Sequence, residues 1–404
     1  MSVLREEEKR LVIAVDPGFN ATKITVNGLL VLDIPKDIVD ITGNMHTMIG
    51  EKGDEYYVSR YIAGKEYLVG HNARKLMLEK ENQTTQDKVY GALNSYKYFE
   101  TTESDINIMT AIGVALIKYA KWTKNNKIKP TLELDNMEDW EIFLGIALPH
   151  QAVDKVRQNL KMRLAKTHEY SVETKDAIYH LKFSIKEDRC VFISQAIVAL
   201  LGTTSDENGH LIKGSKALDN LPALVIDGGY LTVGIFKFTR VQTVEGAESN
   251  TNFAMSNIYE RIAEKIKREY GRDNIKSFNI QAILDEGGKI VVMKDKNTEY
   301  VDIKKMVKEE EKAVFQEFIA YINDKYDDLI DIKQVLFTGG TGNIYYKYMK
   351  EYVKDHKGHL VDHILLTNYE FYGKEIDPVY AICLGLYKTM RNLIEKMDKK
   401  NKVN

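Results

Sequence analysis

The segment from Asp16 to Lys23 places an acidic side chain, a glycine and a lysine in one short turn. β-Branched runs at 11–15 and 22–26 flank it, so the pattern predicts a hairpin. A tight turn between strands directs backbone N–H groups into one concavity that suits phosphate oxygens, and Gly18 has no side chain to block their approach. Lys23 could reach a phosphate, and Asp16 could hold Mg²⁺ directly or through water. For this segment alone, an ordinary hairpin turn is the alternative.

A second turn of the same kind follows the apolar run 224–226. The run ends in Asp227, Gly228 and Gly229, and Thr232 precedes a further β-branched stretch. Taken alone, this segment too is explained by a plain hairpin. Two acid–glycine turns that face each other across a cleft would form a clamp for a phosphate and its Mg²⁺.

A third glycine-rich segment follows the strand-like run 334–337 and precedes a helical pattern. Its residues are Gly339, Gly340, Thr341 and Gly342. A glycine-rich turn at a helix N-terminus lets a base or a phosphate approach the backbone closely. The spacing is neither that of a Walker motif nor that of a dinucleotide-binding fingerprint.

Strand-like and helical patterns alternate along the 404 residues, which predicts an α/β protein with more than one domain. The stretch 203–220 is rich in Gly, Ser, Asp and Asn and reads as a linker. It separates two stretches that each begin with a strand, an Asp-x-Gly turn and a second strand. This repetition predicts an internally duplicated, two-lobed protein that binds its ligand between the lobes.

Composition excludes several other classes. The net charge is −2, so no global basic field favours direct binding of nucleic acid. The two cysteines, Cys190 and Cys383, cannot form a disulfide framework or a four-cysteine metal site. No apolar run of about 18 residues predicts a membrane span, and the charged first ten residues do not resemble a signal peptide. We therefore expect a cytoplasmic protein.

In combination, the three turns resemble the nucleotide motifs of the actin, DnaK-type chaperone and sugar kinase superfamily. Within it, the chain is most similar to bacterial actin-like proteins of the ParM and Alp type. Stretch 192–200 resembles the connecting helix of actin, and Gln195 falls on its water-positioning residue. The matches follow the family's order over nearly the whole chain: Asp16, Gly18, Thr22 and Lys23; Gln195; Asp227, Gly229 and Thr232; Gly339 and Gly340.

The resemblance implies a two-lobed actin-like ATPase fold made of duplicated ribonuclease H-like domains. Lobe I would span 1–220, with an inserted subdomain at about 33–95 and a C-terminal helix at 378–404 that packs back on it. Lobe II would span 221–377, with an insertion at about 259–335.

The resemblance also implies hydrolysis of ATP, or GTP, by water in the presence of Mg²⁺. Asp16 and Asp227 would organise Mg²⁺ and water, Lys23 would neutralise phosphate charge, and Gln195 would orient the attacking water. A helix-start glutamine bonded to backbone is the alternative for Gln195. The other implied nucleotide-binding residues are Gly18, Phe19, Asn20, Thr22, Gly228, Gly229, Thr232, Gly339, Gly340, Thr341 and Gly342.

The chain departs from its relatives at several of these positions. Phe19 and Asn20 stand where relatives often carry Ser, Gly or Thr, and Gly234 replaces a frequent acidic residue. Thr341 replaces a third glycine. Gln195 stands where many ParM-like proteins carry Glu, and an amide cannot act as a strong base.

By resemblance, the chain would form filaments that segregate plasmid DNA through a DNA-binding adaptor of the ParR type. A cell-shape or division actin of the MreB or FtsA type and a non-polymerising nucleotide-binding scaffold are the alternatives. A sugar or acyl kinase would need a catalytic carboxylate that Gln195 does not supply. A chaperone would need a peptide-binding domain after about residue 380.

Overall fold

The computed structural model describes residues 9–18, 20–43, 55–79, 96–212, 220–240, 243–285, 287–294, 297–367, 370–371 and 373–401. The chain divides into two compact units. Unit 1 comprises Met1–Lys213 and Glu370–Asn404, and unit 2 comprises Gly214–Tyr369. Both boundaries between the units, after Lys213 and after Tyr369, lie a few residues before the predicted lobe boundaries at 220 and 377.

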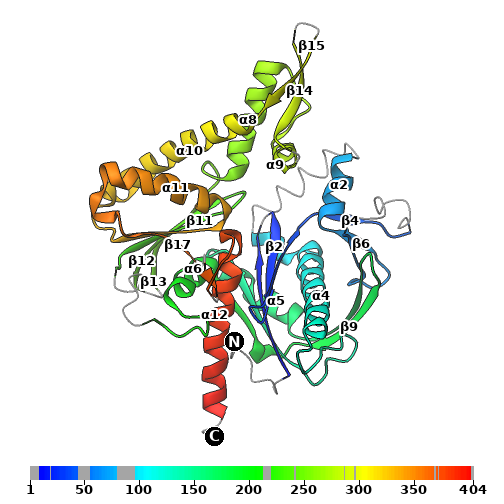
Figure 1. Cartoon of the computed structure of the whole chain (residues 1–404). Helices are drawn as coiled ribbons and strands as arrows, with labels where there is room; N and C mark the ends of the chain where they lie inside the picture. The colour runs from blue at the N-terminus through cyan, green and yellow to red at the C-terminus, as the bar shows by residue number, and fades with distance from the viewer. Residues whose placement is uncertain are drawn as a thin grey trace. The chain divides into compact units, whose positions relative to one another are not determined.

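The central sheet of unit 1, which contains β2 (Figure 1), has the strand order β10-β7-β1-β2-β3. Strand β1 pairs antiparallel with β2 and parallel with β7. Seven of the eight residues of β1 are buried, as expected for a strand covered on both faces. The strands are β1 (Arg10–Pro17), β2 (Ala21–Val26), β3 (Leu30–Pro35), β7 (Glu141–Leu148) and β10 (Cys190–Ser194).

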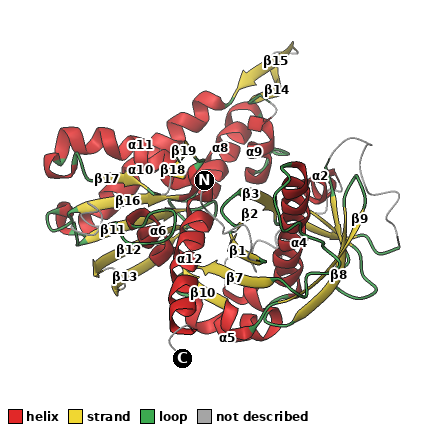
Figure 2. Ribbon diagram, turned by 60° about the horizontal axis from the view of Figure 1, so that its bottom comes forward, coloured by secondary structure: helices red, strands yellow, loops and turns green. Residues whose placement is uncertain are grey.

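Helices cover both faces of this sheet (Figure 2). Helix α4 (Thr102–Asn125) contacts β2 and β3, whereas α12 (Ala381–Asn401) contacts β1 and β7 and packs against α6 (Gln195–Thr204). A Cβ at Gly145 of β7 would lie 2.9 Å from Met390 of α12, so this glycine permits the close approach of the helix. Helix α5 (Val153–Leu164) contacts β10.

A second sheet of unit 1 has the order β4-β6-β5-β8-β9. The predicted insertion at 33–95 supplies only its short strands, and β8 and β9 join from a distant part of the chain. Helix α4 also contacts this sheet, and Tyr170 of β8 donates a hydrogen bond to the Met109 carbonyl. The elements are β4 (Ile38–Asp40), β5 (Tyr57–Ser59), β6 (Tyr67–Val69), β8 (Thr167–Glu173), β9 (Ile178–Ser184) and helix α2 (His71–Glu79), which follows β6.

Unit 2 repeats the pairing seen in the central sheet of unit 1. Its sheet has the order β13-β12-β11-β16-β17, with β11 antiparallel to β12 and parallel to β16. The repeated pairing is the duplication that the sequence predicts. The strands are β11 (Ala223–Gly228), β12 (Val233–Arg240), β13 (Thr243–Asn250), β16 (Gln334–Thr338) and β17 (Ile364–Leu366).

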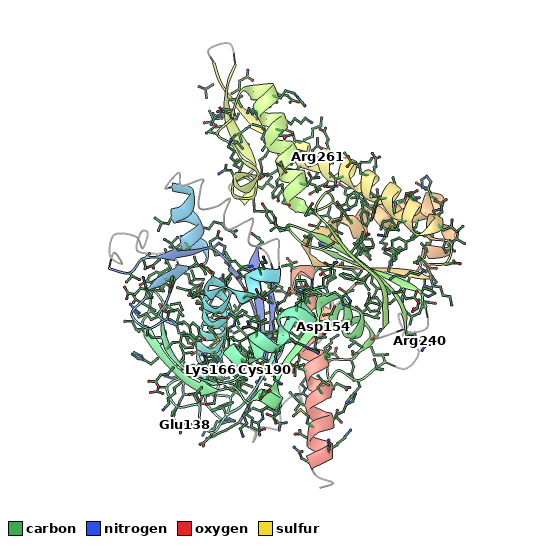
Figure 3. All side chains as sticks on the ribbon, turned by 180° about the vertical axis from the view of Figure 1, so that it is seen from behind. Glu138, Asp154, Lys166, Cys190, Arg240 and Arg261 are labelled. Carbon is green, nitrogen blue, oxygen red and sulfur yellow. The ribbon has the colours of Figure 1, made fainter. Side chains whose placement is uncertain are left out.

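Helices and a separate hairpin complete unit 2. Helix α11 (Gly339–His356) packs on the sheet, and α8 (Met255–Tyr270) packs against both α9 (Ser277–Asp285) and α10 (Lys304–Lys325). On α8, Arg261 (Figure 3) donates two hydrogen bonds, of 2.6 and 2.7 Å, to Glu317 of α10. The hairpin is formed by β14 (Lys289–Lys294) and β15 (Asn297–Asp302).

The earlier return to unit 1 has a packing explanation. Strand β18 (Glu370–Phe371) pairs with β19 (Lys374–Glu375), and the buried ring of Phe371 lies 5.9 Å from the Tyr387 ring of α12. Gly28 also lies against both rings. Residues 370–377, which the prediction gave to lobe II, belong to unit 1, and this aromatic contact packs Phe371 against it.

Candidate functional site

The first predicted turn connects β1 and β2, and Asp16 and Lys23 are directly opposite each other in the ladder. Residues opposite each other in a sheet project to the same face. Asp16 is 4% exposed, and its Oδ2 lies 3.9 Å from Nζ of Lys23. The Lys23 ammonium lies directly against Gly18, where a Cβ would be 2.7 Å from Nζ. The turn therefore presents a buried carboxylate, an ammonium and bare backbone together.

Gln195 is the first residue of α6 and joins this cluster. Its Nε2 donates a hydrogen bond of 2.6 Å to Oδ1 of Asp16. Strand β10, which leads directly into α6, lies on β7, and β7 lies on β1. Parallel strands end at the same edge of a sheet, so the start of α6 and the end of β1 meet there. The amide bonds a side chain of the first turn rather than backbone.

Lys36, which the sequence analysis did not single out, adds a second lysine to the cluster. It is buried, and its Nζ lies 3.3 Å from the centroid of the Tyr98 ring. Burial raises the pKa of Asp16, and the charges of Lys23 and Lys36 and the hydrogen bond from Gln195 oppose that rise. Burial and the charge of Lys23 hold the pKa of Lys36 well below its usual range. Two lysines around one carboxylate form an environment that favours an anion.

The remaining residues of the first turn are placed differently. Thr22 is next to Lys23 on β2, and strand alternation directs its buried side chain to the opposite face. Among the described residues, its hydroxyl has no hydrogen-bond partner. The side-chain and backbone oxygens of Asn20 both accept hydrogen bonds from Arg74. Phe19 lies outside the described residues.

The second and third predicted turns meet within unit 2. Strands β11 and β16 are parallel neighbours, so Asp227 and Gly228 end beside the start of α11. A Cβ at Gly228 would lie 2.1 Å from the Gly342 amide nitrogen, so only glycine fits there. Thr341 donates a hydrogen bond of 2.7 Å from its Oγ1 to the Gly229 carbonyl. The side chain of Thr341, in place of a third glycine, thus ties the two turns together.

The turn of unit 2 is closed by backbone bonding. The Gly229 N–H donates to the Thr232 carbonyl at 2.9 Å, which brings Thr232 back beside the glycines. Gly234 is directly opposite Asp227 in the ladder, and a Cβ there would lie 2.6 Å from the Phe236 ring. Any side chain at 234 would therefore have to displace the Phe236 ring.

Gly339 and Gly340 begin α11 but differ in their surroundings. Gly339 has a positive φ of 80°, and a Cβ there would lie 2.5 Å from the Gly228 carbonyl oxygen. A Cβ at Gly340 would meet nothing within 4 Å. No side chain caps this helix N-terminus through its N-cap residue, Thr338. Packing therefore does not explain the glycine at 340, whereas the close approach of a ligand to the helix N-terminus would.

The acidic side chains of the described residues suit a metal ion that is held mainly by the phosphates of a bound nucleotide. No group of three or more His, Cys, Asp or Glu there could hold a metal ion. Mg²⁺ commonly binds through one or two carboxylates while phosphates and waters complete its shell. Asp16 and Asp227, each at the end of a strand, match that donor chemistry.

Among the described residues, no helix combines the length and the apolar character that a membrane span needs.

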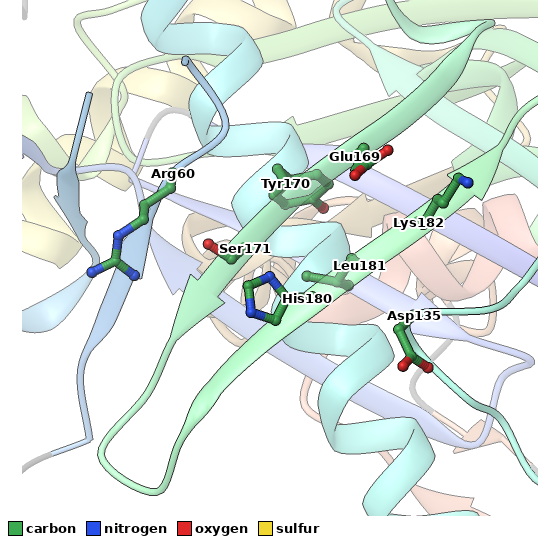
Figure 4. Close-up of a pocket in the computed structure, with 8 residues that line it drawn as sticks. All are labelled: Arg60, Asp135, Glu169, Tyr170, Ser171, His180, Leu181 and Lys182. Carbon is green, nitrogen blue, oxygen red and sulfur yellow. The ribbon is translucent and has the colours of Figure 1, made fainter. Parts of the chain in front are cut away.

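A separate pocket of about 370 Å³ lies on the second sheet of unit 1 (Figure 4). None of the predicted site residues lines it. Its walls are mostly polar side chains of β8 and β9: Arg60, Asp135, Glu169, Tyr170, Ser171, His180, Leu181 and Lys182.

Comparison with known proteins identifies relatives of the fold. Residues 223–371 match a family described as the Alp7A C-terminal domain. The crystal structure of actin-like protein Alp7A has a TM-score of 0.66 and 14% identity, covering 98% of this chain and 100% of that one. A ParM protein from a 15-stranded filament of Clostridium botulinum has a TM-score of 0.61 and 18% identity, with coverage of 95% and 99%. No curated protein matches the chain.

An archaeal actin homologue is also similar, with a TM-score of 0.61 and 14% identity over 96% of this chain and 99% of that one. These likenesses confirm the predicted actin-like fold. The match to the Alp7A C-terminal domain supports the resemblance to the Alp type over residues 223–371.

Proposed function

We propose that this chain, an actin-like protein with an Alp7A-type C-terminal domain, hydrolyses Mg-ATP or Mg-GTP and uses the reaction to control its own filaments. The observation that carries the proposal is the contact of Gln195 with Asp16 beside Lys23. These side chains come from distant segments and converge on a glycine-containing turn. A water-orienting amide, a carboxylate and an ammonium are the functional groups that phosphoryl transfer to water needs.

In the proposed reaction, the turn of unit 1 binds the phosphates of the nucleotide. Lys23 and the backbone N–H groups near Gly18 hold phosphate oxygens and offset their negative charge. Gln195 orients the attacking water, and its bond to Asp16 fixes the rotamer of the amide. In unit 2, the N-terminus of α11 at Gly339 and Gly340 offers backbone N–H groups that suit a nucleotide.

Asp16 and Asp227 are proposed to hold the waters of a bound Mg²⁺. When bound, Mg²⁺ neutralises phosphate charge and helps to align the phosphate for in-line attack. Burial raises the pKa of Asp16, and the neighbouring lysines and Gln195 favour the ionised form that such binding requires.

Filament formation and plasmid segregation complete the proposal. The relative from Clostridium botulinum is a ParM filament, which supports self-association of a chain with the same fold. DNA would be reached through an adaptor of the ParR type rather than directly, in keeping with the net charge of −2. Such a role places the protein in the cytoplasm, where plasmid DNA lies.

The assignment is tested by phosphate release from Mg-ATP and Mg-GTP by the wild-type chain and by Asp227→Ala. Loss of the carboxylate should lower the rate by about a hundredfold or more, the size of effect seen when one transition-state electrostatic contact is removed. Asp302→Ala, on the hairpin of unit 2, is the control. Equal rates for Asp227→Ala and wild type would overturn the assignment of this turn.

A further inference from the structure

Arg74 of helix α2 contacts the first turn from outside the set of predicted site residues. Its Nη2 donates to the Asn20 carbonyl at 3.1 Å and to Asn20 Oδ1 at 2.9 Å, while its Nε donates to Asp37 Oδ2 at 2.7 Å. One guanidinium thus holds three oxygens on two segments. We call Arg74, Asn20 and Asp37 the Arg74 clamp.

Backbone hydrogen bonds close the clamp into a ring. The Lys36 N–H donates to the Asn20 carbonyl at 3.2 Å, and the Gly70 N–H donates to the Asp37 carbonyl at 3.0 Å. The Arg74 N–H in turn bonds the Gly70 carbonyl at 3.0 Å. The first turn, the segment between β3 and β4, and the start of α2 are therefore joined within a few bonds of one another.

We propose that Arg74 is a positioning residue for the proposed nucleotide reaction, acting through Asn20 to fix the first turn. The inference rests on the proposed function. Asn20 is the last residue before β2, so its orientation sets where the backbone of the turn and Lys23 point. Because Arg74 binds both its side-chain oxygen and its carbonyl oxygen, Asn20 is held in place and fixes the end of the turn.

The shape of the guanidinium is what the clamp uses. Its planar fork can donate to Asn20 and Asp37 at the same time, whereas a lysine ammonium is a single point charge on a flexible stem. Asp37 fixes the fork from one side and leaves Nη2 directed at Asn20. A lysine at 74 would keep the charge and lose part of this geometry.

Arg60 provides a matched control in the same part of unit 1. Its side chain is 24% exposed and that of Arg74 is 31% exposed, and each pairs with carboxylates. Arg60 (Figure 4) binds Glu66 and Glu173, and these two bonds tie β8 to the segment before β6. Loss of Arg60 therefore removes a comparable structural contact of the second sheet without removing the clamp.

The test measures Mg-ATP affinity by equilibrium dialysis, steady-state phosphate release and thermal melting for Arg74→Met, Arg74→Lys, Asn20→Ala and Arg60→Met. We expect both methionine variants to melt at lower temperature. Of these two, only Arg74→Met should raise the Kd for Mg-ATP, by about tenfold, which corresponds to the loss of about 1.4 kcal/mol of binding free energy. Arg74→Lys should be intermediate. Asn20→Ala should raise the Kd as much as Arg74→Met does. The double variant that carries both substitutions should show no further loss of affinity.

A Kd for Arg74→Met equal to that of Arg60→Met would overturn the inference while leaving the proposed function intact. So would an additive loss in the Asn20→Ala and Arg74→Met double variant. If Arg74→Met does not fold, Arg74→Lys and Asn20→Ala decide in the same way. Failure of the wild-type chain to bind Mg-ATP or Mg-GTP would instead overturn the proposed function.

Discussion

The amide of Gln195 donates a 2.6 Å hydrogen bond to the buried carboxylate of Asp16, although 179 residues separate the two in the chain. Asp16 is at the end of β1, and Gln195 is the first residue of α6. The bond joins Gln195, whose amide would orient the attacking water, to Asp16, whose carboxylate would help to hold Mg²⁺. A change at either residue should therefore affect hydrolysis more than the ground-state binding of nucleotide.

Substitution Gln195→Ala should slow phosphate release by about a hundredfold, because a transition-state contact is removed. The Kd for Mg-ATP should stay within about threefold of the wild-type value, since Lys23 and the backbone contacts are retained. Single-turnover phosphate release and equilibrium binding separate these effects. If affinity falls together with the rate, Gln195 is a structural residue of the turn.

Substitution Asp16→Asn tests the electrostatics of the first turn. Burial raises the pKa of Asp16 above its usual value, so the folded state binds more protons than the unfolded state in the pH window just above that value. In that window the Asp16 contribution to stability increases as the pH falls. The variant should therefore melt at a higher temperature than wild type at neutral pH, and the difference should shrink on acidification. It should also lose phosphate release.

Melting curves of both nucleotide-free proteins across pH measure this difference directly. A variant that melts below wild type at neutral pH would show that the ion pair with Lys23 stabilises the fold more than burial of the carboxylate destabilises it.

Two glycine substitutions in unit 2 should have opposite effects. A methyl group at Gly228 would overlap backbone atoms of Gly342, so Gly228→Ala should lower the free energy of unfolding by about 3 kcal/mol or more. Gly340→Ala meets no atom and replaces a poor helix former, so it should raise the free energy of unfolding by about 0.5 kcal/mol. Urea denaturation measures both values.

Gly340→Ala should nevertheless weaken Mg-ATP binding, because the added methyl occupies the space proposed for the ligand. A stable Gly340→Ala variant that binds Mg-ATP as tightly as wild type would remove Gly340 from the site.

Assembly should depend on nucleotide. Light scattering by the wild-type chain should rise after Mg-ATP or Mg-GTP is added above a critical concentration, and should fall as the nucleotide is consumed. Head-to-tail contacts use two different surfaces and therefore propagate into open filaments. Sedimentation and electron microscopy distinguish filaments from amorphous aggregates. A protein that stays monomeric with either nucleotide, and with a slowly hydrolysed analogue, would favour the nucleotide-binding scaffold.

Local sequence patterns were sufficient for much of the fold. The apolar runs at 11–15 and 224–226 are contiguous signals, and the strands that they predict are present as β1 and β11. Strands β8 and β13 escaped prediction because their sequences, THEYSVE and TVEGAESN, are largely polar. Their conformation depends on pairing with β5 and β9 in one case and with β12 in the other.

The sequence by itself determined the residue types of each turn, because the chemistry of an acid–glycine turn is encoded in a few adjacent positions. It also determined the duplication, since a strand, an acid–glycine turn and a second strand follow one another at two places in the chain. The tertiary structure decided that Gln195 bonds Asp16, that the charge of Lys36 acts on the same carboxylate, and that Arg74 holds Asn20. These contacts depend on strand order and on the packing of α2. Both follow from the burial of whole elements, so no local residue spacing in the sequence predicts them.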